Sequence, residues 1–218
     1  MNLVIFGPPG AGKGTQSKFI VNKFNLFQLS TGELLRNEII NKTKLGSEIS
    51  SKMNSGNLVS DSIVGGLIEK FISNKEYKNR LIFDGYPRNK SQADNLNILL
   101  KKCDQKIDLV LKLSVSIDSI KKRISGRSVC SICGKIYNEF FNPAPINSDC
   151  CAPKFLQKRS DDTLNVAITR YETYENNIKP VIDFYKETNL LKVVNGEASI
   201  SQITNEISDL IEGIKGWL

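Results

Sequence analysis

A glycine-rich run with a single lysine stands near the start of the chain. Residues 7–15 read GPPGAGKGT and follow the apolar stretch Leu3 to Phe6. A glycine-rich turn between a strand and a helix lets backbone N–H groups surround a polyphosphate, while the lysine reaches the terminal phosphates. We therefore predict a phosphate-binding loop, followed by a helical stretch from Gln16, that consists of Gly10, Ala11, Gly12, Lys13, Gly14 and Thr15. Because a glycine directly follows the lysine, where this loop commonly has Ser or Thr, magnesium ligation by the later Thr15 hydroxyl stays open.

An acid and an arginine follow another apolar stretch. Asp84 and Arg88 belong to the run DGYPR, which comes directly after Leu81 to Phe83. Ligands bind at the carboxyl ends of the strands in open α/β sheets, and a carboxylate there can hold magnesium through its water shell. The alternative, a cap and a turn, explains Gly85 and Pro87 but gives no reason for the arginine.

The counts of arginine and histidine narrow the chemistry. Among its 30 basic residues the chain has 23 Lys and only seven Arg, and it has no His. A guanidinium group grips phosphate with two parallel hydrogen bonds, whereas an ammonium group is a point charge. The few arginines are therefore candidate phosphate ligands. Without imidazole, Ser-His-Asp catalysis, Cys-His catalysis and His-ligated zinc hydrolysis are excluded.

Length and composition indicate one globular domain with insertions. The 218 residues are 40% hydrophobic and 24% charged, which is ordinary for a folded chain. The net charge of +7 suits an anionic partner, but it does not separate a nucleotide from a nucleic acid. No stretch approaches about 20 apolar residues, and no leader is visible before Leu3. We therefore expect a cytoplasmic protein without a membrane segment.

Short apolar runs alternate with helix-length segments along the chain. This spacing predicts an α/β fold with a five-stranded parallel sheet flanked by helices. The strands are expected at Leu3 to Phe6, Phe27 to Leu29, Leu81 to Phe83, Leu109 to Leu113 and Leu191 to Val194. An apolar stripe from Ile200 to Ile214 predicts a helix that packs on the sheet. Residues 30–59 and 126–162 interrupt the alternation, and we interpret them as two flaps on a core of residues 1–29, 60–125 and 163–218.

Taken in order, the motifs resemble those of one family over essentially the whole chain. They are GPPGAGKGTQ, STGELLR at 30–36, DGYPR at 84–88 with Gln92, ISGR at 124–127, RSDD at 159–162, and Arg170. This series is similar to the motifs of bacterial-type, long-lid adenylate kinases, and it leaves only Arg80 as ordinary surface charge. The resemblance implies a P-loop NTPase-type fold, in which residues 30–59 form the AMP-binding flap and residues 126–162 the lid. It also implies reversible transfer of the ATP γ-phosphoryl group to AMP, giving two ADP, with Mg²⁺ accompanying ATP.

The resemblance also assigns roles to residues. For ATP it adds Arg123, Arg127, Ile136, Tyr137 and Ala198 to the loop residues. For AMP it implies Thr31, Arg36, Asn57, Leu58, Val59, Gly85, Tyr86, Pro87, Arg88, Gln92, Arg159 and Arg170, with Gln92 reading the adenine edge. The catalytic set is then Lys13, Asp84, Arg88, Arg123, Arg127, Arg159 and Arg170. Because an AMP phosphate oxygen is already nucleophilic at neutral pH, no general base is required, which agrees with the absence of histidine.

Four of the five cysteines lie between residues 130 and 151, while Cys103 stands apart. This clustering favours reduced thiols or a metal site over a disulfide framework. Cys130 and Cys133 have the spacing of a zinc knuckle, but Cys150 and Cys151 are adjacent where zinc-bearing lids of the family have a second Cys-x-x-Cys. Two interpretations stay open: a structural zinc held by Cys130, Cys133, Cys150 and Cys151, with Asp149 as a possible substitute ligand, or a lid without metal.

Other classes of function explain less of the sequence. A kinase for another nucleoside monophosphate would share the phosphate loop and differ in its base pocket, where Gln92 favours adenine. The sequence does not distinguish ATP from GTP as the phosphoryl donor. A nucleic-acid-binding protein could combine positive charge with a Cys-rich segment, but it would not need the loop, and a guanine-specifying TKxD-type motif of a nucleotide switch is not apparent. We expect a monomer whose partners are ATP, AMP and ADP, with no nucleic acid and no membrane.

Overall fold

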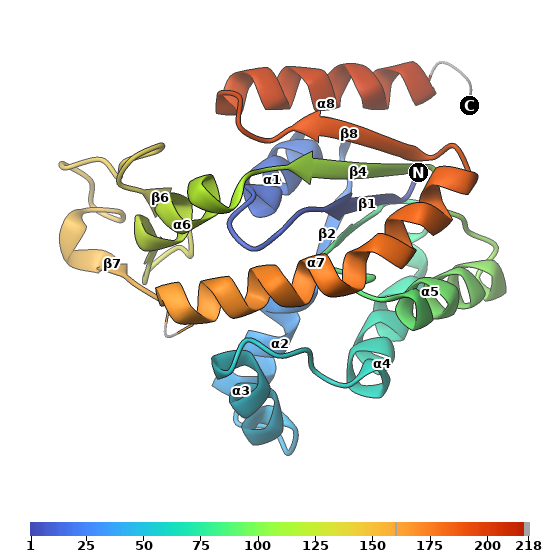
Figure 1. Ribbon diagram of the computed structural model, residues 1–218, viewed down its shortest axis with the longest axis horizontal. Coiled ribbons are helices and arrows are strands. Elements are labelled where there is room, and N and C mark those ends of the chain that lie inside the picture. The colour runs from blue at the N-terminus through green and yellow to red at the C-terminus, as the bar shows by residue number, and fades with distance from the viewer. Residues whose placement is uncertain (160, 216–218) are drawn as a thin grey trace.

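A five-stranded parallel sheet lies at the centre of the computed structural model, which describes residues 1–159 and 161–215 (Figure 1). Ser160 of the RSDD run and residues 216–218 of the predicted core segment lie outside the described residues. The strands are β1 (Leu3–Phe6), β2 (Phe27–Ser30), β3 (Leu81–Asp84), β4 (Leu109–Ser114) and β8 (Leu191–Asn195). Their order in the sheet is β2-β3-β1-β4-β8. The predicted fold and all five predicted strands are confirmed, and four of the strands extend one residue further at the carboxyl end.

The strands are apolar because both faces of the sheet are covered. In β1, Val4 and Phe6 pack into one hydrophobic cluster while Leu3 and Ile5 pack into another on the opposite face, as the two-residue period of a strand requires. Helices α4 (Asp61–Ile72), α5 (Lys90–Lys102) and α7 (Leu164–Glu187) cover the first face. Helices α1 (Lys13–Phe24), α6 (Ile117–Ser125) and α8 (Ile200–Lys215) cover the second.

The predicted C-terminal helix is α8. Its buried residues Ile203, Ile207 and Ile211 recur every four positions and pack against the second face of the sheet. The apolar stripe read from the sequence is therefore the face that joins the core. Across the described residues, each helix is either too short or too polar to cross a lipid bilayer.

Two insertions project from the carboxyl side of the sheet (Figure 1). The flap contains α2 (Thr31–Ile40) and α3 (Gly46–Asn54), which pack on each other. The lid contains β5 (Arg127–Cys130), β6 (Ile136–Asn138), the short 3₁₀ helix η2 (Pro153–Phe155) and β7 (Leu156–Gln157). Its three strands form an antiparallel sheet in the order β6-β5-β7. A further 3₁₀ turn, η1 (Lys75–Tyr77), joins α4 to β3.

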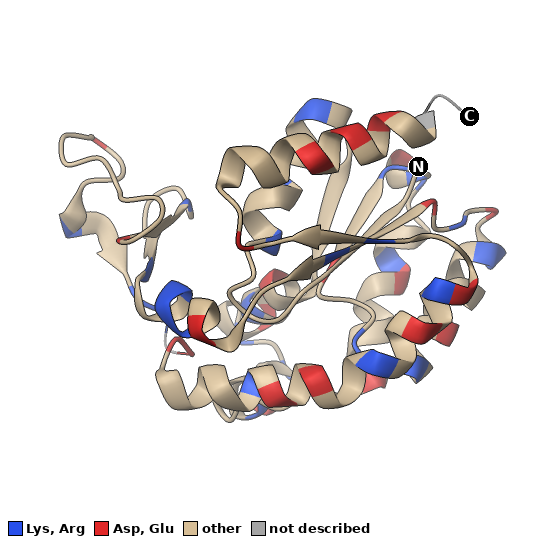
Figure 2. Ribbon diagram, turned by 45° about the horizontal axis from the view of Figure 1, so that its top comes forward, with Lys and Arg blue, Asp and Glu red and all other residues tan. Residues whose placement is uncertain are grey.

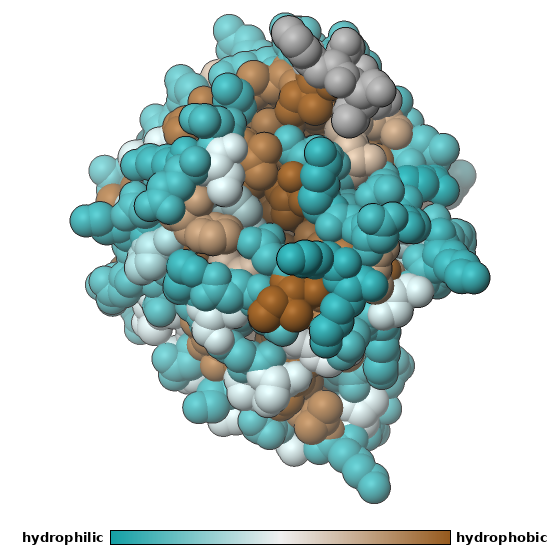
Figure 3. Space-filling model, turned by 90° about the vertical axis from the view of Figure 1, so that its right-hand side faces the viewer, coloured by the Kyte–Doolittle hydropathy of each residue, from teal (hydrophilic) through white to brown (hydrophobic). Residues whose placement is uncertain are grey.

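The face turned away from the lid has an ordinary protein surface. Figure 3 shows it as mostly hydrophilic, with hydrophobic side chains exposed in a broken band between the polar ones. Figure 2 shows that acidic and basic residues alternate over most helices of the described chain rather than separating onto two sides. The net positive charge is therefore not concentrated in one broad basic face.

Candidate active site

The phosphate loop turns directly from β1 into α1. Helix α1 begins at Lys13, three residues before the predicted start at Gln16. Gly10 and Gly12 have φ angles of 81° and 97°, which residues with a Cβ rarely adopt. No side chain caps the helix at Gly12, so the first N–H groups of α1 open toward solvent with the positive end of the helix dipole. This loop presents the donor array that a polyphosphate requires.

Lys13 lies at the base of this loop. Its Nζ donates hydrogen bonds to the carbonyl oxygens of Gly7 and Pro8, at 2.7 and 3.0 Å. Burial lowers the pKa of Lys13 to about 8, although the nearby charge of Asp84 opposes the shift. The ammonium group is thus held in place by weak neutral acceptors, which a phosphate group can replace.

Asp84 ends β3 beside the loop and is 7% exposed. Its Oδ2 accepts a hydrogen bond from Gln28 Nε2 at 2.8 Å. Burial raises the pKa of Asp84, and Lys13 opposes that shift. Gln28 was not predicted as a site residue from the sequence. The only sign of such a role was an amide side chain within the otherwise apolar run of β2. Parallel pairing of β2 with β3 brings the two side chains together.

A cleft of about 880 Å³ opens over the loop between core, flap and lid. Six of the seven arginines line it: Arg36, Arg88, Arg123, Arg127, Arg159 and Arg170. The other predicted residues that line it are residues 10–15, Asn57, Leu58, Val59, Asp84, Gly85, Pro87, Ile136, Tyr137 and Ala198. Arg80 lies elsewhere and donates to the backbone and side-chain oxygens of Asn25, at 3.0 and 2.7 Å. The cleft thus gathers the guanidinium groups that the sequence singled out.

These guanidinium groups repel one another. Desolvation of the guanidinium group within the cleft, together with the charge of Arg170, lowers the pKa of Arg88 to about 10. Desolvation and the charges of Arg36 and Arg127 likewise lower the pKa of Arg159 to about 10. Such a concentration of like charge is unfavourable without an anion. A polyphosphate would remove the repulsion.

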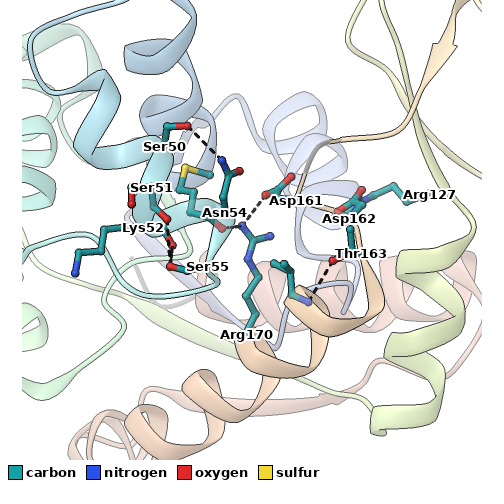
Figure 4. Close-up of polar contacts among 12 residues, drawn as sticks. Ser50, Ser51, Lys52, Asn54, Ser55, Arg127, Asp161, Asp162, Thr163 and Arg170 are labelled. Carbon is teal, nitrogen blue, oxygen red and sulfur yellow. Dashed lines mark hydrogen bonds and ion pairs between the residues drawn. The ribbon is translucent and has the colours of Figure 1, made fainter.

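Two carboxylates at the lid hinge hold arginines of the cleft (Figure 4). Arg127 donates from Nε to Asp162 Oδ2 at 2.7 Å, and its second nitrogen pairs with the other carboxylate oxygen. Arg170 donates to Asp161 at 2.6 Å and to the carbonyl oxygen of Met53 in the flap at 3.2 Å. Burial would raise the pKa of Asp161, but the charge and hydrogen bond of Arg170, together with the charges of Arg36 and Arg127, outweigh burial, and the pKa is lowered. Both acids lie in the RSDD run, where the sequence assigned them no role.

Gly85, which directly follows β3, contacts Thr31 at the start of the flap at the second end of the cleft. Its φ is 78°, and a Cβ there would lie 2.9 Å from Thr31 Oγ1 and 3.2 Å from Arg88 Nη2. Its carbonyl oxygen accepts from Thr31 Oγ1 at 2.9 Å and from Arg88 Nε at 2.7 Å. Only glycine fits this close approach. Tyr86, a predicted AMP ligand, is instead fully buried in the core, and its bond to Pro87 is cis.

A second, smaller pocket adjoins the cleft beneath the flap. It is lined by Thr31, Leu35, Leu58, Val59, Val64, Gly85, Arg88 and Gln92. Its wall is thus mainly aliphatic, with one buried amide, Gln92, which is 3% exposed. The volume of about 20 Å³ admits a single water molecule. A larger occupant requires the flap to move.

Aromatic side chains of the lid face the loop at the other end. Arg123 donates to the carbonyl oxygens of Ala11 and Gly196, at 3.1 and 2.7 Å. Its guanidinium carbon lies 5.4 Å from the ring centre of Phe141, a cation–π distance. Phe140 and Phe141 line the cleft and are 59% and 48% exposed. Neither phenylalanine was predicted as a site residue; the only signal in the sequence was a pair of adjacent aromatics close to Tyr137.

The structure brings all four lid cysteines together. The sulfur atoms of Cys130, Cys133, Cys150 and Cys151 lie within 4.8 Å of one another. Among the residues that the structure describes, Asp149 does not join this cluster of possible metal ligands. The Cys130–Cys150 and Cys133–Cys151 sulfur distances are 3.9 and 3.5 Å. Four thiolates bound to zinc at about 2.3 Å in a tetrahedron would stand about 3.8 Å apart. The donor set therefore fits zinc, and the adjacency of two cysteines does not prevent convergence.

The parallel sheet, the glycine loop at a helix N-terminus and the arginine-lined cleft define a P-loop phosphotransferase. Comparisons with known proteins narrow this class. The family model for adenylate kinase matches residues 5–190. An adenylate kinase of Pelagibacter ubique (strain HTCC1062) is 47% identical over 212 residues, covering 97% of this chain and all of that protein. One of Fusobacterium nucleatum subsp. nucleatum is 43% identical, covering 97% and 98%.

A third relative is similar over almost the same length. An adenylate kinase of Methanothrix thermoacetophila is 40% identical over 213 residues, covering 97% of this chain and 98% of that protein. The chain belongs to the adenylate kinase family. The kinase predicted from the ordered motifs is thereby confirmed.

Proposed function

We propose that the chain transfers the γ-phosphoryl group of ATP reversibly to AMP, giving two ADP, within the arginine-lined cleft. The observation that carries this assignment is the gathering of six of the seven arginines with Lys13 around one cavity. A site for one nucleotide would not need guanidinium groups from core, flap and lid together. Two polyphosphates that meet end to end do need them, because the transferring group and both its neighbours are anionic.

ATP lies at the loop end of the cleft. Its phosphates accept hydrogen bonds from the loop amides and from Lys13, while Arg123 and Phe141, whose planar groups now lie against each other, would separate to stack on its base. Ile136, Tyr137 and Ala198 complete the base site. When bound, Mg²⁺ would neutralise phosphate charge, and Asp84 would hold its water shell. The buried Asp84 carboxylate, fixed by Gln28, suits that role.

AMP lies at the flap end. Arg36 and Arg88 hold its phosphate, and Thr31 lies close by, because Thr31 and Arg88 both donate to the carbonyl oxygen of Gly85. Its base enters the aliphatic pocket beneath the flap, where Gln92 reads the polar edge. Because this pocket admits only one water as it stands, AMP enters with a movement of residues 30–59.

The reaction needs alignment and charge neutralisation rather than a proton acceptor. An AMP phosphate oxygen forms the new bond to the γ-phosphorus as the bond from that phosphorus to the β–γ bridging oxygen breaks, and ADP leaves with the electron pair. Arg88, Arg127, Arg159 and Arg170 surround the transferred group and stabilise its charge. Asp161 and Asp162 hold two of these arginines until phosphate takes their place.

Residues 30–59 and 126–162 act as moving parts on the core. Lid closure over substrates is an established property of adenylate kinases. In this chain the closing segments carry Arg36 on one side and Arg127 and Arg159 on the other. Closure therefore delivers the charges that stabilise transfer at the same moment that it excludes water.

Zinc in the lid is part of the proposal, with a structural role. Four thiol ligands fill a tetrahedral shell and leave no open position for catalysis. All five cysteines are free thiols, which fits a reducing, cytoplasmic compartment. We expect the enzyme to act as a monomer because one chain supplies both ends of the cleft.

A coupled assay for ADP formation from ATP and AMP tests the function. Lys13→Ala is expected to lower kcat by about 10³-fold, because a charge beside the transferring phosphoryl group is lost. Lys23→Ala is the matched control on the same helix, since Lys23 pairs with Glu212 away from the cleft. GMP, UMP and CMP in place of AMP measure base choice. Absence of ADP with wild-type protein, or full activity of Lys13→Ala, would overturn the assignment.

A further inference from the structure

Gln92 is held at both ends of its amide. Its Oε1 accepts a hydrogen bond from the backbone N–H of Arg88 at 2.8 Å, and its Nε2 donates to Asp61 Oδ1 at 2.7 Å. Asn89 donates its side-chain N–H to both oxygens of the same carboxylate, at 3.1 and 3.2 Å. Asp61 thus serves as a common acceptor for two amides beside the small pocket.

Asp61 is not otherwise engaged in the site. It is the first residue of α4, two positions after Val59 at the end of the flap. Within the described residues no lysine or arginine forms an ion pair with it. Its charge is therefore available to strengthen the hydrogen bond from Gln92, since bonds to an ionised acceptor are stronger than neutral ones.

The two partners allow only one orientation of the amide. Turning it by 180° would bring Oε1 against the Asp61 carboxylate and the NH₂ group against the Arg88 N–H. Both contacts would then be repulsive. In the orientation that is held, the amide keeps one N–H and one carbonyl lone pair for a ligand.

Adenine and guanine require opposite polarity at this edge. Adenine offers a ring-nitrogen acceptor beside an amino donor, whereas guanine offers a ring N–H beside a carbonyl acceptor. A fixed amide can match one of these patterns well, and a freely turning amide can match either. The polarity of Gln92 is thus a means of selecting the base.

We propose that Asp61 is a positioning residue that sets the polarity of the Gln92 amide and so favours AMP over GMP. This inference rests on the proposed function, because it assumes that Gln92 faces the acceptor base. It adds a residue that does not itself contact the substrate. Asp61 is also the first residue of α4, the helix that directly follows the flap. A movement of the flap could therefore affect the selection of the base through Asp61.

The test compares kcat/KM for AMP and GMP, with ATP as donor, in the wild type and in four variants: Asp61→Ala, Asp61→Asn, Asp94→Ala and Gln92→Ala. In Asp61→Ala the AMP:GMP ratio is expected to fall at least about tenfold, the value of one hydrogen bond to a charged group. KM for ATP should not change. Asp61→Asn keeps an oxygen toward Gln92 and should recover most of the ratio. Asp94→Ala removes the same charge from α5, where Asp94 pairs with Lys90, and should behave as wild type.

Each outcome separates this proposal from the function on which it rests. A twofold or smaller change in the ratio for Asp61→Ala, with a collapse for Gln92→Ala, overturns the role of Asp61 and leaves the kinase assignment intact. If Gln92→Ala also leaves the ratio unchanged, the amide does not read the base and the proposal falls with it. If Asp61→Ala fails to fold by thermal unfolding, Asp61→Ser, whose hydroxyl is too short to reach Gln92, decides the same comparison.

Discussion

At the scale of single residues, Lys13 is a cation whose direct hydrogen-bond partners are neutral. Its ammonium group meets two carbonyl oxygens and the positive end of α1. Burial lowers its pKa from 10.5 to about 8. Above pH 8 the empty site therefore loses a charge that phosphate would restore, so nucleotide binding at alkaline pH must be linked to proton uptake.

Nitrogen NMR of the lysine side chains measures this directly. The Lys13 signal, assigned by its loss in Lys13→Gln, should titrate with a midpoint near pH 8 in empty protein. Saturating ATP should move the midpoint upward, because the phosphates stabilise the charged form. A midpoint that ATP leaves unchanged would show that Lys13 does not contact the phosphates.

At the scale of elements, the lid has very little core of its own. Its fully buried hydrophobic cluster consists of Cys130, Tyr137 and Cys151, with a few partly buried neighbours. Such a cluster buries too little apolar surface to order the 37 residues of the lid by itself, and small units of this kind commonly depend on a metal. We therefore expect the cysteines to stabilise β5, β6 and β7 by holding a metal as well as by packing.

We expect about one zinc per chain in protein purified without chelator, measured by elemental analysis. Cys133→Ser should lose the metal and lower Tm by more than about 3 °C, the shift that about 1 kcal/mol causes in a chain of this size. Cys103→Ser is the matched control, because Cys103 lies outside the cluster. A metal content near zero in the wild type would establish the lid without zinc.

At the scale of the whole molecule, core, flap and lid contribute positive charges that repel one another, and on the proposed function the substrate phosphates would relieve this repulsion. Arg88 and Arg170 come from the core, Arg36 from the flap, and Arg127 and Arg159 from the lid. Desolvation and, after it, the charges of neighbouring arginines lower the pKa values of Arg88 and Arg159. Function here opposes stability, as is common where an active site is built for a charged transition state.

Replacing Arg159 by glutamine should raise the stability of the empty protein while it lowers activity. Because folding lowers the Arg159 pKa, its charge is less favourable in the folded state than in the unfolded one. We expect Tm to rise by about 2–4 °C, for about 1 kcal/mol, and kcat to fall by about 10³-fold. Arg80→Gln, outside the cleft, should keep wild-type activity. A lower Tm for Arg159→Gln would mean that its attraction to Asp161 and Asp162 outweighs the repulsion.

Local patterns in the sequence were enough to predict the secondary-structure elements and the phosphate loop. Buried parallel strands are continuous apolar runs, so Leu3 to Phe6 and the four other strands were visible without a structure. The loop was equally visible because it depends on glycines within nine consecutive residues. The motif order also identified the arginines of the cleft, although Tyr86, read as a ligand, lies in the core.

Contacts between distant residues were decided only by the tertiary structure. Gln28 and Asp84 are 56 positions apart, and Asp61 and Gln92 are 31 apart. No periodicity connects such pairs, because strand pairing and helix packing bring them together after the local elements have formed. The same holds for Cys150 and Cys151, whose backbone turns both sulfurs toward Cys130 and Cys133. Sequence spacing specified which groups were available, and folding decided which of them meet.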